Sequence, residues 1–131
     1  MKNIVKDWIM FADRDLSAAE LLLKDEHPLT NIVAFHCQQT IEKYLKAFLI
    51  ENDMPLVKTH DLKKLNDMAK EIKDLGIDEE KLDVINQVYS ETRYPGTLGL
   101  MPDGMPTIRL ADEFLDFAKE VKSIILKELN I

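Results

Sequence analysis

The spacing of apolar residues along the chain predicts helices almost everywhere, and no strand-like alternation competes with it. Three long helices are predicted over residues 3–24, 29–52 and 108–129. Two shorter helices are predicted between them, one beginning near residue 59 and one over 78–94. The expected fold class is therefore all-α, and the two long helices over 3–24 and 29–52 are expected to pair as an antiparallel hairpin across a short turn.

The segments between these helices contain residues that begin and end helices. Thr59 is a suitable N-cap for the third helix, with Asp61 where the helix dipole favours a negative charge. Gly76 is expected to end that helix, and Pro95 to end the fourth because proline has no amide hydrogen. Residues 95–106 hold three of the four glycines and three of the five prolines. So long a connection is commonly functional or disordered.

The helix predicted over 29–52 is apolar on more than one side. Its broad face holds Val33, Cys37, Ile41, Tyr44, Leu45 and Phe48, and its other side holds Ile32, Phe35 and Ile50. In a chain this short, such a helix is either the centre of the fold or part of a dimer interface. The single cysteine excludes an intrachain disulfide and is expected to be an inert core thiol.

Composition narrows the class of protein. A length of 131 residues suits a single domain spanning 1–131. The formal net charge of −7 argues against a generic nucleic-acid coat, which needs a broad basic surface. No stretch has the length of a membrane-spanning helix, and the first residues do not form a signal peptide. A cytoplasmic protein without membrane contact is the default expectation.

The helix over 29–52 also carries a polar stripe. On a helical wheel, His36, Gln39, Lys43 and Lys46 fall within one arc, with Glu42 at its margin. The simpler interpretation is a solvated face with an i,i+4 pair between Glu42 and Lys46. The other interpretation is a lined groove in which the two lysines attract a phosphate or an acidic partner.

Arg93 and Tyr94 stand at the end of the fourth predicted helix. A cation in the last turn of a helix is favourable on dipole grounds alone. An arginine directly before a long Gly- and Pro-rich connection is also placed where binding sites often lie. Both interpretations remain open. The sequence has no Gly-rich phosphate loop and no Cys/His cluster at ligand spacing, so neither a cofactor nor a metal is expected.

Three motifs occur in order along the chain. They are FHCQQTIEKYLKAFL (35–49), THDLKKL (59–65) and YSETRYP (89–95). Their order and spacing resemble the HEPN domain family of prokaryotic helical proteins. The resemblance covers nearly the whole chain, including the opening FADRDLSAAELLL (11–23).

The resemblance implies an antiparallel up-and-down four-helix bundle core with an additional short helix, which usually forms a dimer. It also implies a partnership with small nucleotidyltransferases encoded nearby, often as a toxin–antitoxin pair. Many members of the wider family are metal-independent ribonucleases that carry an arginine followed, after four to six residues, by a histidine. The dimer brings two such motifs together at one composite site.

The sequence departs from that ribonuclease motif. No histidine follows Arg93, and none of the three histidines has an arginine upstream at the required spacing. The expected function is therefore a dimeric nucleotide- or substrate-binding partner of a nucleotidyltransferase, without catalytic activity of its own. Its predicted nucleotide- or partner-binding residues are Arg93, Tyr94, His36, Gln39, Glu42, Lys43 and Lys46.

Two alternatives remain beside this expectation. One is a metal-independent ribonuclease toxin with a variant active site that uses Arg93, with His36 or His60 supplied by the partner subunit. The other is a purely structural helical dimer in which the polar stripe is merely solvated.

Overall fold

The computed structural model describes residues 1–92 and 105–131. This described part contains five α-helices and no strand. The helices are α1 (Asn3–Leu23), α2 (Thr30–Glu51), α3 (Leu62–Lys70), α4 (Glu79–Glu91) and α5 (Ile108–Glu128). The prediction of an all-α helical bundle with about five helices is confirmed.

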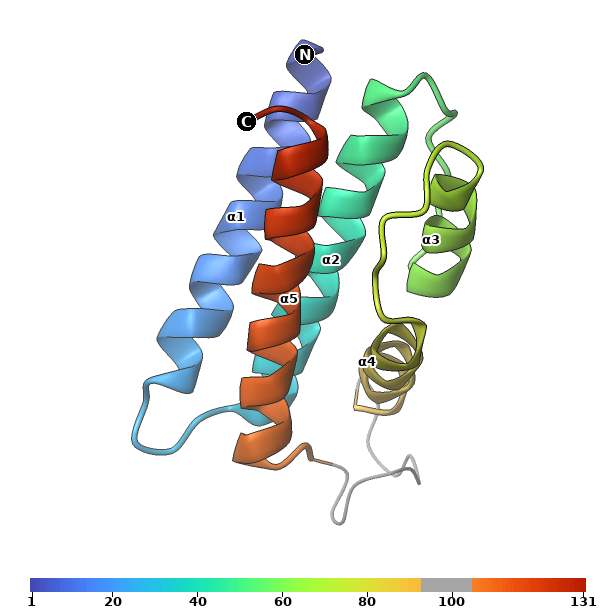
Figure 1. The fold of residues 1–131 in the computed structure, drawn as a ribbon. Coiled ribbons are helices and arrows are strands. Elements are labelled where there is room, and N and C mark those ends of the chain that lie inside the picture. Colours follow the sequence, from blue (N-terminus) through green and yellow to red (C-terminus); the bar gives the residue numbers. More distant parts are fainter. Residues whose placement is uncertain (93–104) are drawn as a thin grey trace.

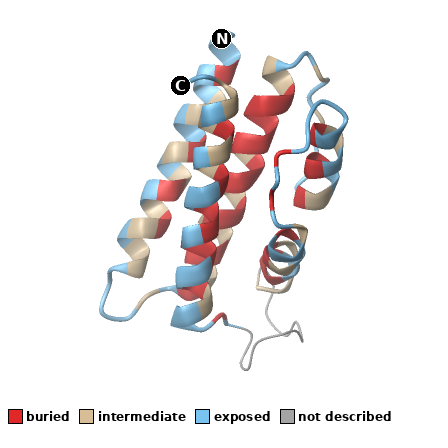
Figure 2. Ribbon diagram, in the orientation of Figure 1, coloured by how far each residue is buried: buried red, intermediate tan, exposed pale blue. Residues whose placement is uncertain are grey.

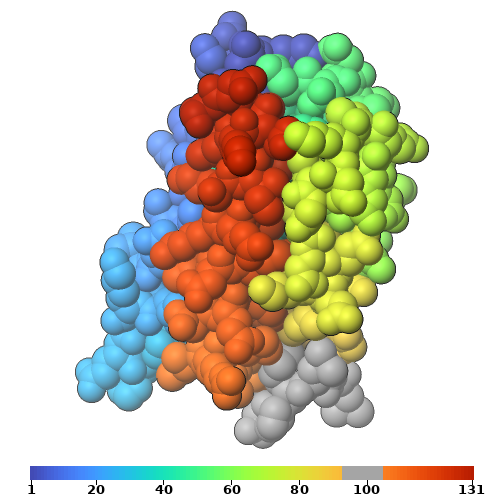
Figure 3. All heavy atoms as spheres, in the orientation of Figure 1, coloured from blue at the N-terminus to red at the C-terminus, as the bar shows by residue number. Residues whose placement is uncertain are grey.

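The three long helices lie side by side and the two short ones lie along one edge (Figure 1). α1 and α2 run antiparallel, and α5 packs against both while running parallel to α2. α4 is seen nearly end-on in this view, so its axis crosses those of the long helices. On the face drawn in Figure 3, α5 lies between α1 and the α3–α4 edge. α2 packs against each of the other four helices.

The central place of α2 follows from its apolar residues. Fourteen of its 22 residues are buried, and Figure 2 shows buried residues along most of its length. Every residue predicted for its broad face is buried, from Val33 to Phe48. Because burying each large apolar side chain contributes about 1.5–3 kcal/mol, such a helix is stable only inside the fold. The central-helix interpretation is confirmed, whereas the dimer interface remains a prediction.

The start of α3 differs from the expectation. Asp61, not Thr59, is the N-cap, and its carboxylate accepts hydrogen bonds from the amides of Lys63 and Lys64. The Thr59 hydroxyl accepts a hydrogen bond from the Asp61 amide at 3.2 Å, so it lies just outside the helix. Asn86 of α4 also donates to Asp61 Oδ1, at 2.9 Å. Asp61 is the N-cap in place of Thr59 because its carboxylate accepts hydrogen bonds from two helix amides and from the neighbouring helix at the same time.

The other predicted boundaries are mostly confirmed. Asp78 caps α4 and Thr107 caps α5 through their side-chain oxygens. Gly76 has a φ of 72°, which suits glycine, but α3 has already ended at Lys70. The glycine therefore turns the connection to α4 and does not end the helix. Among the helices of the described ranges, none is long and apolar enough to cross a membrane.

Candidate functional site

The pair formed by Glu42 and Lys46 lies inside the fold. Glu42 is 3% exposed and Lys46 is 6% exposed, so the prediction of a solvated pair is wrong. The Lys46 ammonium donates to Glu42 Oε2 at 3.0 Å and lies 5.6 Å from the centroid of the Trp8 ring on α1. Neighbouring elements cover both groups, which a single helical period cannot reveal.

His60 completes this cluster from the connection that precedes α3. His60 Nδ1 lies 2.8 Å from Glu42 Oε1. The side-chain amide of Gln38 donates to the backbone carbonyl of His60, also at 2.8 Å. The His60 side chain is 63% exposed, whereas the Glu42 side chain is 4% exposed. A buried carboxylate therefore holds one nitrogen of an imidazole whose other edge is open to solvent.

Asp15 of α1 organises a second cluster. Its Oδ1 lies 2.8 Å from His36 Nδ1, and its Oδ2 accepts from the Lys43 ammonium. Gln39, between the two clusters, donates to Gln38 Oε1 at 2.9 Å. The structure thus divides the predicted stripe into two networks, and both of its lysines already have carboxylate partners.

Two further titratable groups lie on the apolar face of α2. Burial raises the pKa of the Cys37 thiol to about 12, more than nearby Lys119 lowers it, so the expected inert core thiol is confirmed. The Tyr44 hydroxyl donates to the Asp13 carboxylate. Burial, this hydrogen bond and the negative charge of Asp13 hold the pKa of Tyr44 well above its usual value. Neither group is poised for chemistry near neutral pH.

A hollow of about 700 Å³ lies between the start of α3 and the second half of α4. Its lining consists of the carboxylates of Asp61 and Asp83 together with His60, Asn86, Gln87, Tyr89 and Ser90. The Tyr89 ring stacks on Phe35 of α2, with 5.8 Å between ring centroids. Aromatic and hydrogen-bonding side chains are combined here, as in many small-molecule sites.

This hollow adjoins the sequence position of the predicted arginine. α4 ends at Glu91 with Thr92 as its C-cap, so Tyr89 and Ser90 belong to its last turn. Arg93 and Tyr94 come directly after Thr92 in the sequence, but they lie outside the described residues. The predicted helix end at Tyr94 lies outside them as well.

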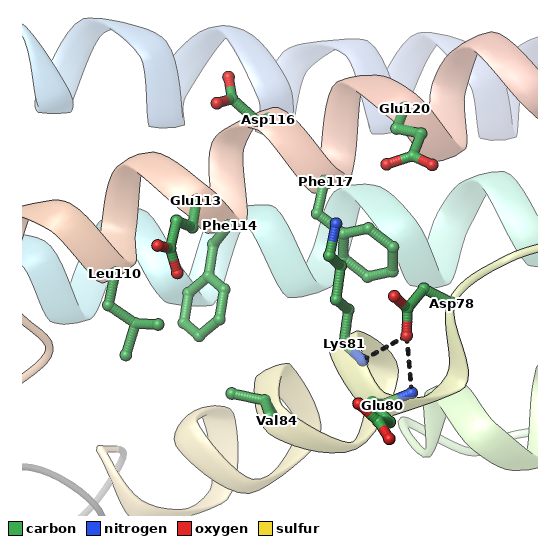
Figure 4. Close-up of a pocket in the computed structure, with 10 residues that line it drawn as sticks. All are labelled: Asp78, Glu80, Lys81, Val84, Leu110, Glu113, Phe114, Asp116, Phe117 and Glu120. Atoms are coloured by element: carbon green, nitrogen blue, oxygen red, sulfur yellow. Dashed lines mark hydrogen bonds between the residues drawn. The ribbon is translucent and has the colours of Figure 1, made fainter.

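A second hollow, of about 530 Å³, lies between α4 and α5 (Figure 4). The rings of Phe114 and Phe117 point from α5 toward α4 and form its floor. Its lining also includes the carboxylates of Glu80, Glu113 and Glu120. Five carboxylates line this hollow and two line the α3–α4 hollow, so repulsion makes the α4–α5 hollow the less suitable of the two for a phosphate group.

Sequence reasoning missed His60 and Asp15 as partners of the stripe. Their distance from it along the chain explains this: His60 follows Glu42 by 18 positions, and Asp15 precedes His36 by 21. No local period connects residues so far apart. The only available signal was that a helix buried on several sides needs internal partners for its polar groups.

The fold and these networks identify the class of protein, which is an all-α bundle built around one buried helix. The chain matches the HEPN domain model over residues 5–129 and belongs to the HEPN domain family. It is similar to the crystal structure of TT1696 from Thermus thermophilus, at 24% sequence identity and a TM-score of 0.79. The match covers 96% of this chain and 98% of that one, and it shows a shared fold. No curated protein matches the sequence.

Breaking the buried pair tests its structural role. We expect Glu42→Gln or Lys46→Met alone to lower the free energy of unfolding by about 3 kcal/mol, because the remaining charge is buried without its partner. The double variant should cost less than the sum of the two single changes. Urea unfolding followed by circular dichroism measures each value.

The matched control is Asp83→Asn, which removes the exposed partner of Lys63. It should cost less than about 1 kcal/mol. Equal losses for Asp83→Asn and Glu42→Gln would contradict the structural role of the buried pair.

Proposed function

We propose that this protein is a homodimeric, non-catalytic HEPN protein that binds a nucleotide or related substrate for a small nucleotidyltransferase partner. Two observations support the proposal: the family to which the chain belongs, and the absence of the ribonuclease motif from its sequence. The chain belongs to the HEPN domain family, yet none of its three histidines follows an arginine after four to six residues. An arginine side chain cannot exchange a proton near neutral pH, so Arg93 cannot replace the missing acid or base. We therefore infer that Arg93 binds a ligand.

The hollow between α3 and α4 supports a ligand-binding role. Gln87 and Ser90 offer hydrogen-bonding groups of the kind that contact a nucleobase or ribose, next to the largely buried ring of Tyr89. We assign Arg93 to the phosphate, because a guanidinium binds phosphate oxygens in pairs. Tyr94 is assigned to the same ligand.

The polar stripe takes a smaller part in this proposal. Lys43 and Lys46 already neutralise carboxylates of the same chain, so they add little net attraction for phosphate. Together with Glu42 they fix the position of α2, while the half-buried His36 and Gln39 remain accessible to the protein partner. Because both lysines are already paired, Arg93 is the principal anion contact in this proposal.

Nucleotide binding tests the proposal directly. Isothermal titration with ATP and GTP should show binding to the wild-type protein. Arg93→Ala should weaken that binding at least about tenfold, because hydrogen bonds to a charged group contribute about 1.5–3 kcal/mol. Arg109→Ala is the matched control, because that side chain is 90% exposed on α5 and pairs only weakly with Glu113.

The partner role has its own readout. A tagged copy of this protein should co-purify with a small nucleotidyltransferase expressed from a neighbouring gene. Failure of both titration and co-purification would refute the proposed function. Nucleotide binding without co-purification would refute the partner role alone.

One observation favours a second candidate, a ribonuclease with a variant active site. Glu42 Oε1 lies 2.8 Å from His60 Nδ1, and His60 also lines the α3–α4 hollow. A carboxylate that binds one ring nitrogen fixes the imidazole tautomer and leaves the other nitrogen able to accept a proton. Such an oriented histidine could replace the missing one as general base.

This candidate predicts cleavage of RNA by the wild-type protein without added metal. His60→Gln should then lower the rate by about a hundredfold or more, since it removes the proton acceptor. His27→Gln, at an exposed position between α1 and α2, should leave the rate unchanged. A wild-type protein that cleaves no RNA in gel assays eliminates the candidate.

A further inference from the structure

The two carboxylates that line the α3–α4 hollow differ in how fully they are already hydrogen-bonded. Asp61 Oδ1 accepts from the amides of Lys63 and Lys64 at the start of α3. The same oxygen accepts from the side-chain amide of Asn86, so Asp61 connects α3 to α4. Asp83 Oδ2, by contrast, lies 3.4 Å from the Lys63 ammonium, in a pair whose side chains are 42% and 55% exposed. Exposed pairs contribute little, so Asp83 is the carboxylate that is available to a ligand.

Two further polar side chains lie on the same face of α4 as Asp83. Gln87 and Ser90 follow it by four and seven positions, which is the spacing of one helix face. All three side chains are exposed and line the hollow. The Gln87 amide nitrogen donates to Glu91 at 3.2 Å, which leaves its carbonyl oxygen as an acceptor. This face therefore offers acceptors at Asp83 and Gln87 and a hydroxyl that can donate at Ser90.

The chemistry of a carboxylate determines which part of a nucleotide it can face. It repels phosphate groups, so Asp83 has to face the base or the ribose. An ionised carboxylate only accepts hydrogen bonds, and its two oxygens match two adjacent donors. Guanine has such a pair on one edge, the N1–H and the 2-amino group. Adenine and cytosine each place an amino group beside a ring-nitrogen acceptor, and uracil places one N–H between two carbonyls.

We propose that the α3–α4 hollow is selective for guanine nucleotides, with the Asp83 carboxylate accepting hydrogen bonds from the N1–H and the 2-amino group of the base. This inference rests on the proposed nucleotide binding and names the class of nucleotide. At 1.5 Å per residue, about 10 Å separates Asp83 from Ser90 along α4. The base lies at the Asp83 end of this stretch, and the ribose and phosphates extend toward the last turn of α4.

Isothermal titration of the full chain with three nucleoside triphosphates tests the selectivity. GTP should bind at least about tenfold more tightly than ATP, because a carboxylate that faces adenine meets a ring-nitrogen acceptor in place of a second donor. Inosine triphosphate keeps the N1–H and lacks the 2-amino group, so its affinity should fall between those of GTP and ATP.

The variant Asp83→Asn tests the assigned contact through a gain as well as a loss. An amide offers one donor and one acceptor, so the variant should bind GTP at least about tenfold more weakly. Xanthine carries a carbonyl in place of the 2-amino group, so the same variant should bind xanthosine triphosphate at least about fivefold more tightly than the wild-type protein does. Misfolding cannot produce such a gain. Asp67→Asn, exposed on α3 and outside the lining of the hollow, is the matched control and should change neither affinity.

The outcomes separate the selectivity from the proposed function. If no nucleotide binds, both this inference and the proposed nucleotide binding are refuted. Equal affinities for GTP and ATP, as expected if Asp83 accepts from the ribose hydroxyls, would overturn the selectivity and leave nucleotide binding intact. A preference for GTP that Asp83→Asn leaves unchanged would overturn the role of Asp83.

Discussion

The burial of α2 against four other helices imposes the constraint on which the rest of the structure depends. Fourteen of its 22 residues are buried, so each polar group among them needs a partner within the protein. The Glu42 carboxylate meets this requirement with the Lys46 ammonium and the His60 imidazole. Across the described ranges, no buried side-chain nitrogen or oxygen lacks a hydrogen-bond partner. The buried polar residues of α2 are therefore part of the core.

This constraint also determines where a ligand can bind. The charges of α2 are neutralised within the chain, which leaves the periphery for function. The α3–α4 hollow lies at one edge of the bundle and α1 lies at the other (Figure 1). The buried pair links the two regions, because Lys46 reaches Trp8 of α1 and Glu42 reaches His60 beside the hollow.

The sequence predicted the helices well because their determinants are local. Apolar spacing placed the three long helices within one or two residues of their observed ends, and Asp78 identified the start of α4. Thr59 misled because two good capping residues stand close together, and a contact with α4 favours Asp61. Local patterns contain no information about such a contact.

The candidate site was predicted only in part. The sequence singled out the polar stripe on α2, but the burial of that stripe depends on α1 and on the connection to α3. The partners Asp15 and His60 are too distant in sequence for any helical period to reveal. The assignment of Arg93 rests on its position in a family motif, and its binding role remains a prediction.

Native-state hydrogen exchange followed by mass spectrometry tests the central claim, that α2 is the buried element to which the other helices attach. Its amides should exchange only through global unfolding, with a protection free energy equal to that measured by urea. The amides of the short α3 should exchange faster, through local opening. If α2 exchanged as quickly as α3, the account of a fold organised around a central helix would be wrong.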